Sequence, residues 1–195
     1  MRLHEKDPLS AVIPTLISTS QKSSTKLATL VRELLNVSKI ESGQLVLNKT
    51  NFNLGTLVEE CCTVARLEGM HKLSVEGETA LEVFADPERI DQVIVNFISN
   101  AIKYGLNSHQ IRVVIEKIEN SAKVSVIDQG IGIEQEKLPH LFERYYRVHP
   151  SGHQYSGLGL GLYISAEIVR LHGGDLGVSS VLGQGSTFWF TIPLS

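Results

Sequence analysis

The sequence predicts an α/β or α+β protein in which one long helix is followed by a domain of alternating strands and helices. Residues from about Leu9 to Glu41 contain few helix breakers, which is typical of one long helix. From Gln44 onward, short alternating segments are interspersed with amphipathic segments, as expected of strands and helices in one domain. The chain has 195 residues, of which 42% are apolar, and this is enough to bury a core. We therefore divide the chain into residues 1–43, which are mainly helical, and residues 44–195, which form a separate domain.

Composition and charge exclude several classes of protein. The 18 basic and 21 acidic residues give a net charge of −3, so there is no general electrostatic attraction to nucleic acid or to an anionic membrane. Cys61 and Cys62 are adjacent in a helical pattern and cannot easily bridge, which excludes a disulfide scaffold and favours a reducing compartment. No apolar run is long enough to span a bilayer. We expect a cytoplasmic location, including as the cytoplasmic part of a membrane-anchored receptor, with no nucleic-acid or membrane contact by this piece.

The long helix expected near the N-terminus has an apolar stripe. The members of the stripe recur at helical spacing and are Leu27, Leu30, Leu34 and Val37, widened by Val31 and Leu35. A heptad-like stripe of this kind packs against a partner helix. Pro8 and Pro14 fit near the start of the helix, and Ser42 with Gly43 indicates its end.

The rest of the chain is predicted to alternate between strands and helices. Strands are expected at Leu45–Leu47, Leu73–Val75, Leu81–Phe84, Ile111–Ile118, Lys123–Ile127, Asp175–Ser180 and Thr187–Leu194. Helices are expected at Leu54–Leu67, Pro87–Tyr104, Gln135–Tyr146 and Leu160–Leu171. Pro87 occupies the first turn of its helix, and Asp86 is the expected N-cap because its side chain can accept from a free N–H group.

A polar face along the helix at 87–104 is the first candidate site. Asn96, Asn100 and Lys103 are spaced by four and three residues and therefore share this face. An amide oxygen suits Mg²⁺, and a lysine can pair with phosphate oxygens. The pattern alone is also typical of a solvated helix face, so it indicates a phosphate and metal site only in combination with other motifs.

Two glycine-rich motifs follow in the sequence. The segment DQGIGI at 128–133 comes directly after an apolar strand, where Asp128 can accept from an exocyclic amine and the glycines allow close backbone approach. The segment GLGLGL at 157–162 precedes a helix, whose N-terminal amides and dipole suit a polyphosphate. Each segment by itself is also typical of an ordinary glycine-rich turn.

Taken in order, these motifs resemble those of the ATP-binding catalytic domain of sensor histidine kinases, in the superfamily shared with DNA gyrase and the heat-shock chaperone ATPases. The matching segments are NFISNAIKY at 96–104, DQGIGI at 128–133, LFERYYR at 141–147 and GLGLGL at 157–162. Residues 25–43 resemble the second helix of the family's dimerisation and histidine-phosphotransfer hairpin, so residues 1–43 would be mainly that helix. The resemblance implies an α+β protein with a partial helical hairpin at residues 1–43, followed at residues 44–195 by an α/β sandwich with a mixed sheet, which is the histidine kinase and gyrase type of ATP-binding fold. It also implies ATP and Mg²⁺ as cofactors.

The resemblance also implies which residues bind the adenine base and the metal ion. Asp128 would accept a hydrogen bond from the adenine amine, and Tyr104 would cover a face of the base. Gly130 and Gly132 would let the pocket wall approach the base closely. Asn100 would coordinate Mg²⁺.

The phosphates would be held by a second group of residues that the resemblance implies. Asn96 would line the phosphate region, and Lys103 would contact phosphate oxygens. The polyphosphate would be clasped by the backbone amides of Gly157, Leu158, Gly159, Leu160 and Gly161, with residues 148–156 as a lid. Arg147 would approach the terminal phosphate, and Arg144 would do so less surely. Surface salt-bridging is the alternative for both arginines, and it weighs more for Arg144. The ATPase relatives have a water-activating glutamate where this chain has Asn96, which favours phosphoryl transfer to a protein side chain over hydrolysis.

The function implied is that of the ATP-binding catalytic portion of a two-component sensor histidine kinase. Such an enzyme is a transferase that passes the γ-phosphoryl group to a histidine and then to the receiver domain of a response regulator. A homodimer is implied for the full-length kinase. His4 stands in a segment similar to the family's acceptor motif, but Pro8 comes one residue early and the stretch to Ile40 is too short for a complete hairpin. We therefore expect the acceptor histidine upstream of Met1 and no autophosphorylation by this piece alone.

Two alternative functions stay open at this point. An anti-sigma-factor-type serine kinase of the same superfamily has similar motifs, although the preceding hairpin-like helix counts against it. A nucleotide-sensing pseudokinase or binding module would bind ATP without phosphotransfer, although the intact motifs count against it.

Overall fold

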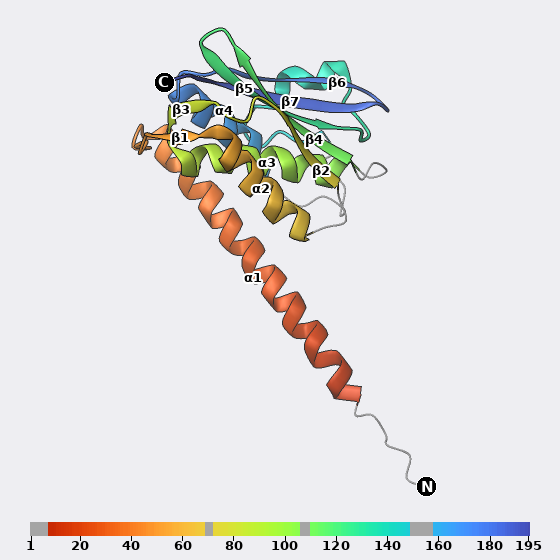
Figure 1. Ribbon diagram of the computed structural model, residues 1–195. Helices are drawn as coiled ribbons and strands as arrows, with labels where there is room; N and C mark the ends of the chain where they lie inside the picture. The colour runs from red at the N-terminus through yellow and green to blue at the C-terminus, as the bar shows by residue number, and fades with distance from the viewer. Residues whose placement is uncertain (1–7, 69–71, 106–109, 149–157) are drawn as a thin grey trace.

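The computed structural model describes residues 8–68, 72–105, 110–148 and 158–195 (Figure 1). The helices are α1 (Pro8–Glu41), α2 (Leu54–Glu68), α3 (Pro87–Tyr104), the 3₁₀ helix η1 (Gln135–His140) and α4 (Gly161–Leu171). The strands are β1 (Thr50–Asn53), β2 (Lys72–Gly77), β3 (Glu82–Ala85), β4 (Gln110–Ile118), β5 (Ser121–Asp128), β6 (Leu176–Val181) and β7 (Gly185–Pro193). His4 and Gly157 lie outside the described residues.

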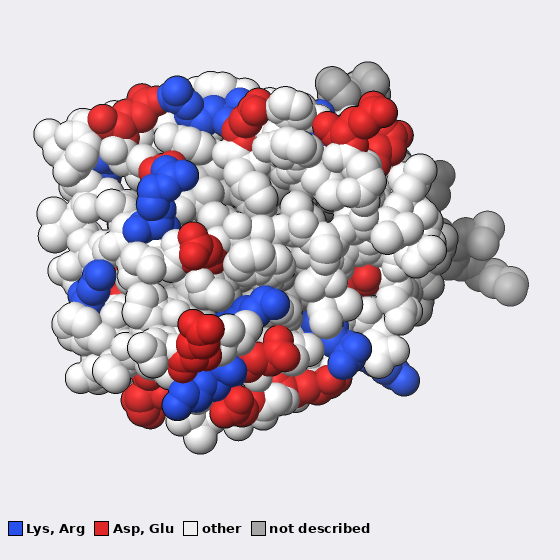
Figure 2. All heavy atoms as spheres, turned by 90° about the horizontal axis from the view of Figure 1, so that it is seen from above, with Lys and Arg blue, Asp and Glu red and all other residues white. Residues whose placement is uncertain are grey.

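The main sheet has five strands in the order β2-β4-β5-β7-β6. Only β2 and β4 run parallel, and the other neighbours are antiparallel, so the predicted mixed sheet and α+β class are confirmed. Helices α2, α3 and α4 lie against one face of this sheet (Figure 1). Figure 2 looks onto the molecule from the sheet side, where basic and acidic side chains are interspersed rather than gathered by sign.

The core lies between the sheet and its helices, because both contribute apolar residues at their own period. Alternate residues of β7 are buried, including Phe188 and Phe190. The Phe97 ring of α3 lies 5.6 Å from the Phe188 ring and 6.0 Å from the Phe190 ring, measured between centroids. The buried side of α3 consists of Ile90, Val93, Ile94, Phe97, Ile98 and Ala101. With this side in the core, the opposite side of α3 is left for polar residues.

The start of α3 is fixed by a buried polar cluster. Asp86 is the N-cap, as predicted, and its Oδ1 accepts from the Arg89 N–H at 3.2 Å. Its Oδ2 accepts from the Asn48 N–H at 2.8 Å. The Asp86 N–H donates to His172 Nε2 at 3.0 Å, and His172 Nδ1 donates to the Ile168 carbonyl at 2.8 Å. The cluster therefore joins the end of α4 to the start of α3, and burial lowers the pKa of His172.

One predicted strand is wrong, and one observed strand is missing from the sequence prediction. The segment Leu45–Leu47 forms no strand, and the following residue, Asn48, instead donates its N–H to Asp86. The strand in this region is β1, which pairs antiparallel with β3 in a separate two-stranded sheet. Apolar alternation identifies a chain segment that can be a strand, but a neighbour with free backbone groups decides whether one forms.

The helix predicted at Gln135–Tyr146 is also wrong over its second half. Only Gln135–His140 is helical, as η1, and the chain then continues through turns. Pro139 lies inside η1 and has no N–H group to continue an α-helical ladder. Tyr145 has a φ of 62°, which no helix residue adopts. This irregular segment carries Arg147 toward the site described below.

Most of α1 extends away from the domain, and its C-terminal part packs against it (Figure 1). Val37 is buried, and Arg89 of α3 donates to Asn36 Oδ1 at 3.4 Å. The helix begins at Pro8, and Pro14 lies in its second turn. Its exposed apolar residues are Ile13, Leu16, Ile17, Leu27, Val31, Leu34 and Leu35. None of the helices in the described chain combines the length and apolar character that a membrane span requires.

Candidate nucleotide-binding site

A cavity of about 400 Å³ lies among α1, α3, the end of β5 and the segment that leads into α4. Of the residues that the sequence predicts for the site, it is lined by Asn96, Asn100, Lys103, Tyr104, Asp128, Gly132, Arg147, Leu158, Gly159, Leu160 and Gly161. Gly130 and Arg144 are not among the lining residues. The structure therefore brings together four motifs that are far apart in the sequence.

The polar face of α3 forms one wall of this cavity. Asn96, Asn100 and Lys103 reach it because Phe97 and its apolar neighbours occupy the opposite side of the helix. Asn96 Nδ2 donates to Ser165 Oγ of α4 at 3.0 Å, which holds the amide in place. The Lys103 ammonium lies 4.9 Å from the centroid of the Tyr104 ring, within the range of a cation–π contact.

The start of α4 packs closely against the polar face of α3. A Cβ atom on Gly161 would lie 2.6 Å from Asn96 Oδ1, so any other residue here would displace the Asn96 amide. Leu160 is the N-cap of α4 and supplies no side-chain hydrogen bond to the helix. The N–H groups of the first turn are therefore not capped by the Leu160 side chain, at the end of the helix where the dipole favours an anion.

Asp128 is the last residue of β5 and also lines the cavity. Its side chain is buried, and its Oδ1 accepts from the Gly130 N–H at 2.8 Å. Burial raises the pKa of Asp128, while backbone hydrogen bonds from Gly130 and Ser186 oppose the change. The carboxyl group is held by the chain's own backbone, with the cavity as its remaining neighbour.

The two glycines after Asp128 are required by the protein's own backbone. A Cβ on Gly130 would lie 2.3 Å from the Tyr104 carbonyl oxygen, and the Ile131 N–H donates to that oxygen at 3.3 Å. Gly132 has a φ of +67°, and a Cβ there would lie 2.1 Å from the Val181 carbonyl oxygen. The glycines shape the wall of the cavity by letting it pack against α3 and β6, and Gly132 alone of the two lines the cavity.

The two arginines of the segment 141–147 have different surroundings. Arg147 lines the cavity. Arg144 forms an ion pair with Glu41 at the end of α1, and its guanidinium lies 5.5 Å from the centroid of the Tyr163 ring. Arg144 therefore corresponds to the alternative interpretation, surface salt-bridging, because α1 supplies an acidic partner outside the cavity. The Tyr145 N–H donates to the Gly159 carbonyl at 3.1 Å, which ties this segment to the glycine-rich one.

The sequence analysis misses the wall that α1 contributes. Lys26, Thr29, Leu30 and Glu33 of α1 line the cavity. Their spacing places them on one helical face, and that is the only signal the sequence carries for them. Glu33 Oε2 is buried and has no hydrogen-bond partner among the described residues. Burial raises the pKa of Glu33.

The capacity of the site for a metal ion is limited by its ligands. No group of three or more His, Cys, Asp or Glu side chains within the described ranges is placed to hold a metal ion. The cavity offers amide oxygens from Asn96 and Asn100, together with the two acidic residues Glu33 and Asp128. This oxygen donor set suits a hard cation that takes its remaining ligands from phosphates and water.

A mixed sheet covered by helices, with a cavity lined by a buried acid, amides, cations and a helix N-terminus, is the class of structure expected of a nucleotide-binding domain. Residues 85–195 match the family model of the histidine kinase-, DNA gyrase B- and HSP90-like ATPases, and the chain belongs to this family. Together with two curated relatives, this match identifies the chain as the catalytic domain of a sensor histidine kinase.

Two curated relatives illustrate the similarity. Sensor protein GacS of Pseudomonas syringae pv. syringae is 35% identical over 188 residues, which cover 91% of this chain and 21% of GacS. Signal transduction histidine-protein kinase BarA of Escherichia coli K12 is 31% identical over 204 residues, covering 99% of this chain and 22% of BarA. The chain therefore spans about a fifth of the length of these relatives.

Solved structures share the fold. The histidine kinase ThkA in complex with the response regulator protein TrrA aligns with a TM-score of 0.74 and 28% identity, over 98% of this chain and 54% of ThkA. Full-length ShkA in complex with AMPPNP aligns with a TM-score of 0.79 and 24% identity, over 93% of this chain and 39% of ShkA. The second likeness, at this identity, concerns the fold alone.

Proposed function

We propose that this domain binds ATP with Mg²⁺ and transfers the γ-phosphoryl group to a histidine, from which it passes to the receiver domain of a response regulator. The observation that carries the proposal is the cavity in which the polar face of α3, Asp128, Arg147 and the start of α4 meet. Each motif by itself has an ordinary structural explanation. Because the motifs converge on one cavity, together they fit a ligand that has a base at one end and phosphates at the other.

Adenine recognition rests on Asp128 in this proposal. A buried carboxylate that accepts from the Gly130 N–H has a further oxygen to accept from the exocyclic amine of adenine. Guanine presents a carbonyl oxygen at that position, which would face the carboxylate without a donor. Tyr104 supplies the aromatic surface beside the base.

The phosphates belong at the opposite end of the cavity. Lys103 and Arg147 supply positive charge, and the segment Leu158–Gly161 supplies backbone N–H groups at the start of α4. Asn100 fits Mg²⁺ through its amide oxygen, and the ion would neutralise charge that develops on the phosphates during transfer. Because phosphoryl transfer depends on alignment of donor and acceptor, the work of these residues is to position and to stabilise charge.

Asn96 favours transfer to a side chain over ATP hydrolysis. An amide cannot accept the proton of an attacking water molecule, and this amide is engaged with Ser165 Oγ at 3.0 Å. The attacking group then has to bring its own base or nucleophilic lone pair. A histidine nitrogen has such a lone pair at neutral pH.

The partners of the proposal are a receiver domain and a second copy of the kinase. The solved complex of ThkA with the response regulator protein TrrA supports the first partner, because this chain aligns with ThkA over 98% of its length. The exposed residues Ile13, Ile17, Leu27, Val31 and Leu34 recur along α1 at steps of four, ten, four and three residues, which place them on one heptad-like stripe and support the second partner. Burying such a stripe against its copy removes apolar surface from water.

Two measurements test the proposal. Titration calorimetry should detect ATP binding that is strengthened by Mg²⁺, and GTP should bind more weakly. Failure to bind ATP at millimolar concentration would overturn the proposal. Incubation with γ-labelled ATP should give acid-labile label only when a helical hairpin with an acceptor histidine is added. Label stable to acid would favour the serine kinase, and ATP binding without any transfer would favour the nucleotide-sensing module.

A further inference from the structure

Helix α1 lies outside residues 85–195, which match the ATPase family, yet it forms part of the nucleotide cavity. Lys26, Thr29, Leu30 and Glu33 line the cavity along one face of this helix. The helix is held there by the buried side chain of Val37 and by the ion pair between Glu41 and Arg144. A ligand in the cavity is therefore adjacent to side chains from both parts of the molecule.

Glu33 is the residue of this face that carries a buried carboxylate oxygen without a hydrogen bond among the described residues. Its Oε2 is shut off from water and has no hydrogen-bond partner among the described residues. This oxygen has lost its hydration without a replacement, which disfavours the charged form of the carboxylate. A cation or a strong donor in the cavity would remove that penalty.

Apart from Glu33, the described residues expected around the phosphates supply no carboxylate ligand for a cation. The acidic residues among the cavity's described lining residues are Glu33 and Asp128. Asp128 is buried at the end of β5, where it accepts from the Gly130 N–H. Mg²⁺ bound to a nucleotide is commonly held by one or two carboxylates together with phosphate oxygens and water. Asn96 and Asn100 at the phosphate end are neutral amides.

We propose that Glu33 is a ligand, directly or through a bound water, of the divalent cation that accompanies the nucleotide. The inference rests on the proposed function, because it assumes that a nucleotide occupies the cavity. The cation would then be shared between Asn100 of α3 and Glu33 of α1. By linkage, binding of the metal and nucleotide together would favour the docked position of α1, and a docked α1 would favour their binding to the same extent.

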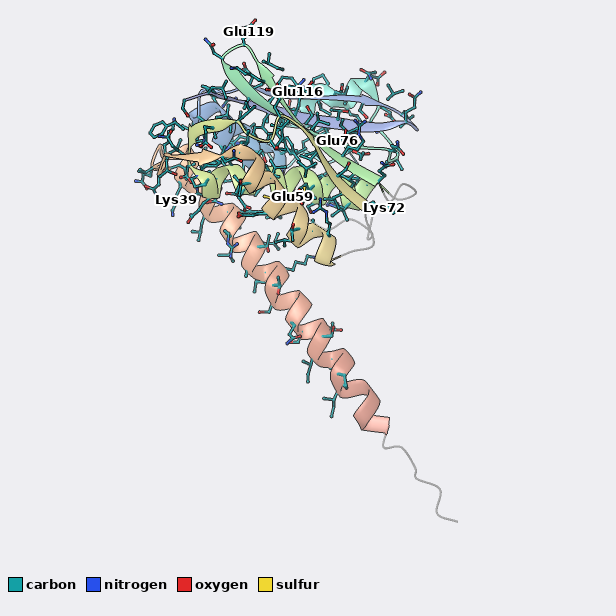
Figure 3. The ribbon with its side chains drawn as sticks, in the orientation of Figure 1. Lys39, Glu59, Lys72, Glu76, Glu116 and Glu119 are labelled. Atoms are coloured by element: carbon teal, nitrogen blue, oxygen red, sulfur yellow. The ribbon has the colours of Figure 1, made fainter. Side chains whose placement is uncertain are left out.

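The test uses the charge-removing variant Glu33→Gln in the complete chain. A matched control is Glu116→Gln, which removes the same charge from an exposed position on β4; Figure 3 shows Glu116 on the sheet, away from α1. ATP affinity is measured by calorimetry over a series of Mg²⁺ concentrations and again in EDTA. We expect Glu33→Gln to weaken Mg²⁺-dependent ATP binding by about tenfold, the lower end of the effect of supporting residues at metal sites.

The measurement in EDTA separates metal binding from simple repulsion. Without the metal, Glu33→Gln should bind ATP as tightly as the parent or more tightly, because a negative charge near the phosphates has been removed. Tighter binding both with and without Mg²⁺ would show that Glu33 only repels the phosphates and would overturn the inference. Unchanged binding in both conditions would also overturn it.

Two further measurements keep the result interpretable. Circular dichroism checks that Glu33→Gln folds as the parent does, and Glu33→Asp, which keeps the charge, should retain more of the Mg²⁺ dependence than Glu33→Gln. Electron paramagnetic resonance of Mn²⁺ in the presence of ADP reports the metal directly, and its binding should weaken in Glu33→Gln but not in Glu116→Gln. If the parent protein itself binds no ATP, the proposed function fails. If the parent binds ATP and Glu33→Gln binds it equally well, only this inference fails.

Discussion

The two ends of the nucleotide cavity are built differently. At the base end, Asp128 is buried and already accepts from the protein's own backbone, and Gly130 and Gly132 pack against neighbouring carbonyl groups. At the phosphate end, the Leu160 side chain does not cap α4, and Glu33 Oε2 has no hydrogen-bond partner among the described residues. At the base end the protein's own backbone already supplies hydrogen-bond partners, whereas groups at the phosphate end gain their partners from the ligand. Substitutions at the two ends should therefore change nucleotide affinity in different ways.

The largest effect is expected from Asp128→Asn at the base end. An asparagine amide keeps a single acceptor oxygen, so it can accept from the Gly130 N–H or from the adenine amine but turns its NH2 group toward the other donor; such a buried mismatch costs up to about 3 kcal/mol, or roughly a hundredfold in affinity. Calorimetry should show similar losses for AMP, ADP and ATP, because all three carry the same base. Asp175→Asn, at an exposed position outside the cavity, is the control. Parent-like binding by Asp128→Asn would contradict the adenine assignment.

The next effect concerns the close packing of α3 against α4. In Gly161→Ala the new Cβ would lie 2.6 Å from Asn96 Oδ1. Moving the amide away would break its hydrogen bond to Ser165 Oγ, which should cost about 1.5 kcal/mol of unfolding free energy, measured by urea denaturation. Asn96→Ala removes the obstructing amide. The double variant should therefore be more stable than the sum of the two single losses predicts, and strict additivity would count against direct contact between the two positions.

Arg147 and Arg144 provide a matched comparison at the phosphate end. Arg147 lines the cavity, so Arg147→Ala should weaken ATP binding by about tenfold through loss of a charge-assisted contact, while AMP binding stays unchanged. Arg144 pairs with Glu41 at the surface, so Arg144→Ala should leave both affinities nearly unchanged and cost less than about 1 kcal/mol of stability. Equal losses of AMP and ATP binding in Arg147→Ala would show that this arginine does not serve the phosphates.

The smallest effect concerns pH and lies outside the cavity. Burial lowers the pKa of His172 below its ordinary value of 6.5, so the unfolded chain binds the proton more readily than the folded one. Its contribution to stability is complete above pH 6.5 and is lost as the pH falls toward the lowered pKa of the folded state. Urea denaturation between about pH 5 and about pH 8 should show a shallower decline in His172→Gln than in the parent. Identical slopes would contradict a buried neutral His172.

Local sequence patterns predict some parts of this molecule well, for identifiable reasons. The apolar and amide faces of α3 follow from residue spacing within one helix, and Asp86 is a cap whose partner lies three residues away. Both features depend on interactions within a single element. The strand at 45–47 and the long helix at 135–146 are wrong because their outcome depends on a partner strand and on Pro139, respectively.

The sequence by itself determines the composition of the two ends of the site: an acid and glycines after β5, and amides, cations and glycines around α3 and α4. Only the tertiary structure decides that α1 closes the phosphate end, that Glu33 enters the cavity and that Arg144 leaves it for Glu41. The reason is physical. Spacing along the chain establishes which side chains share a face of one element, but which faces meet depends on apolar packing between elements that are distant in the sequence, such as α1 and α4.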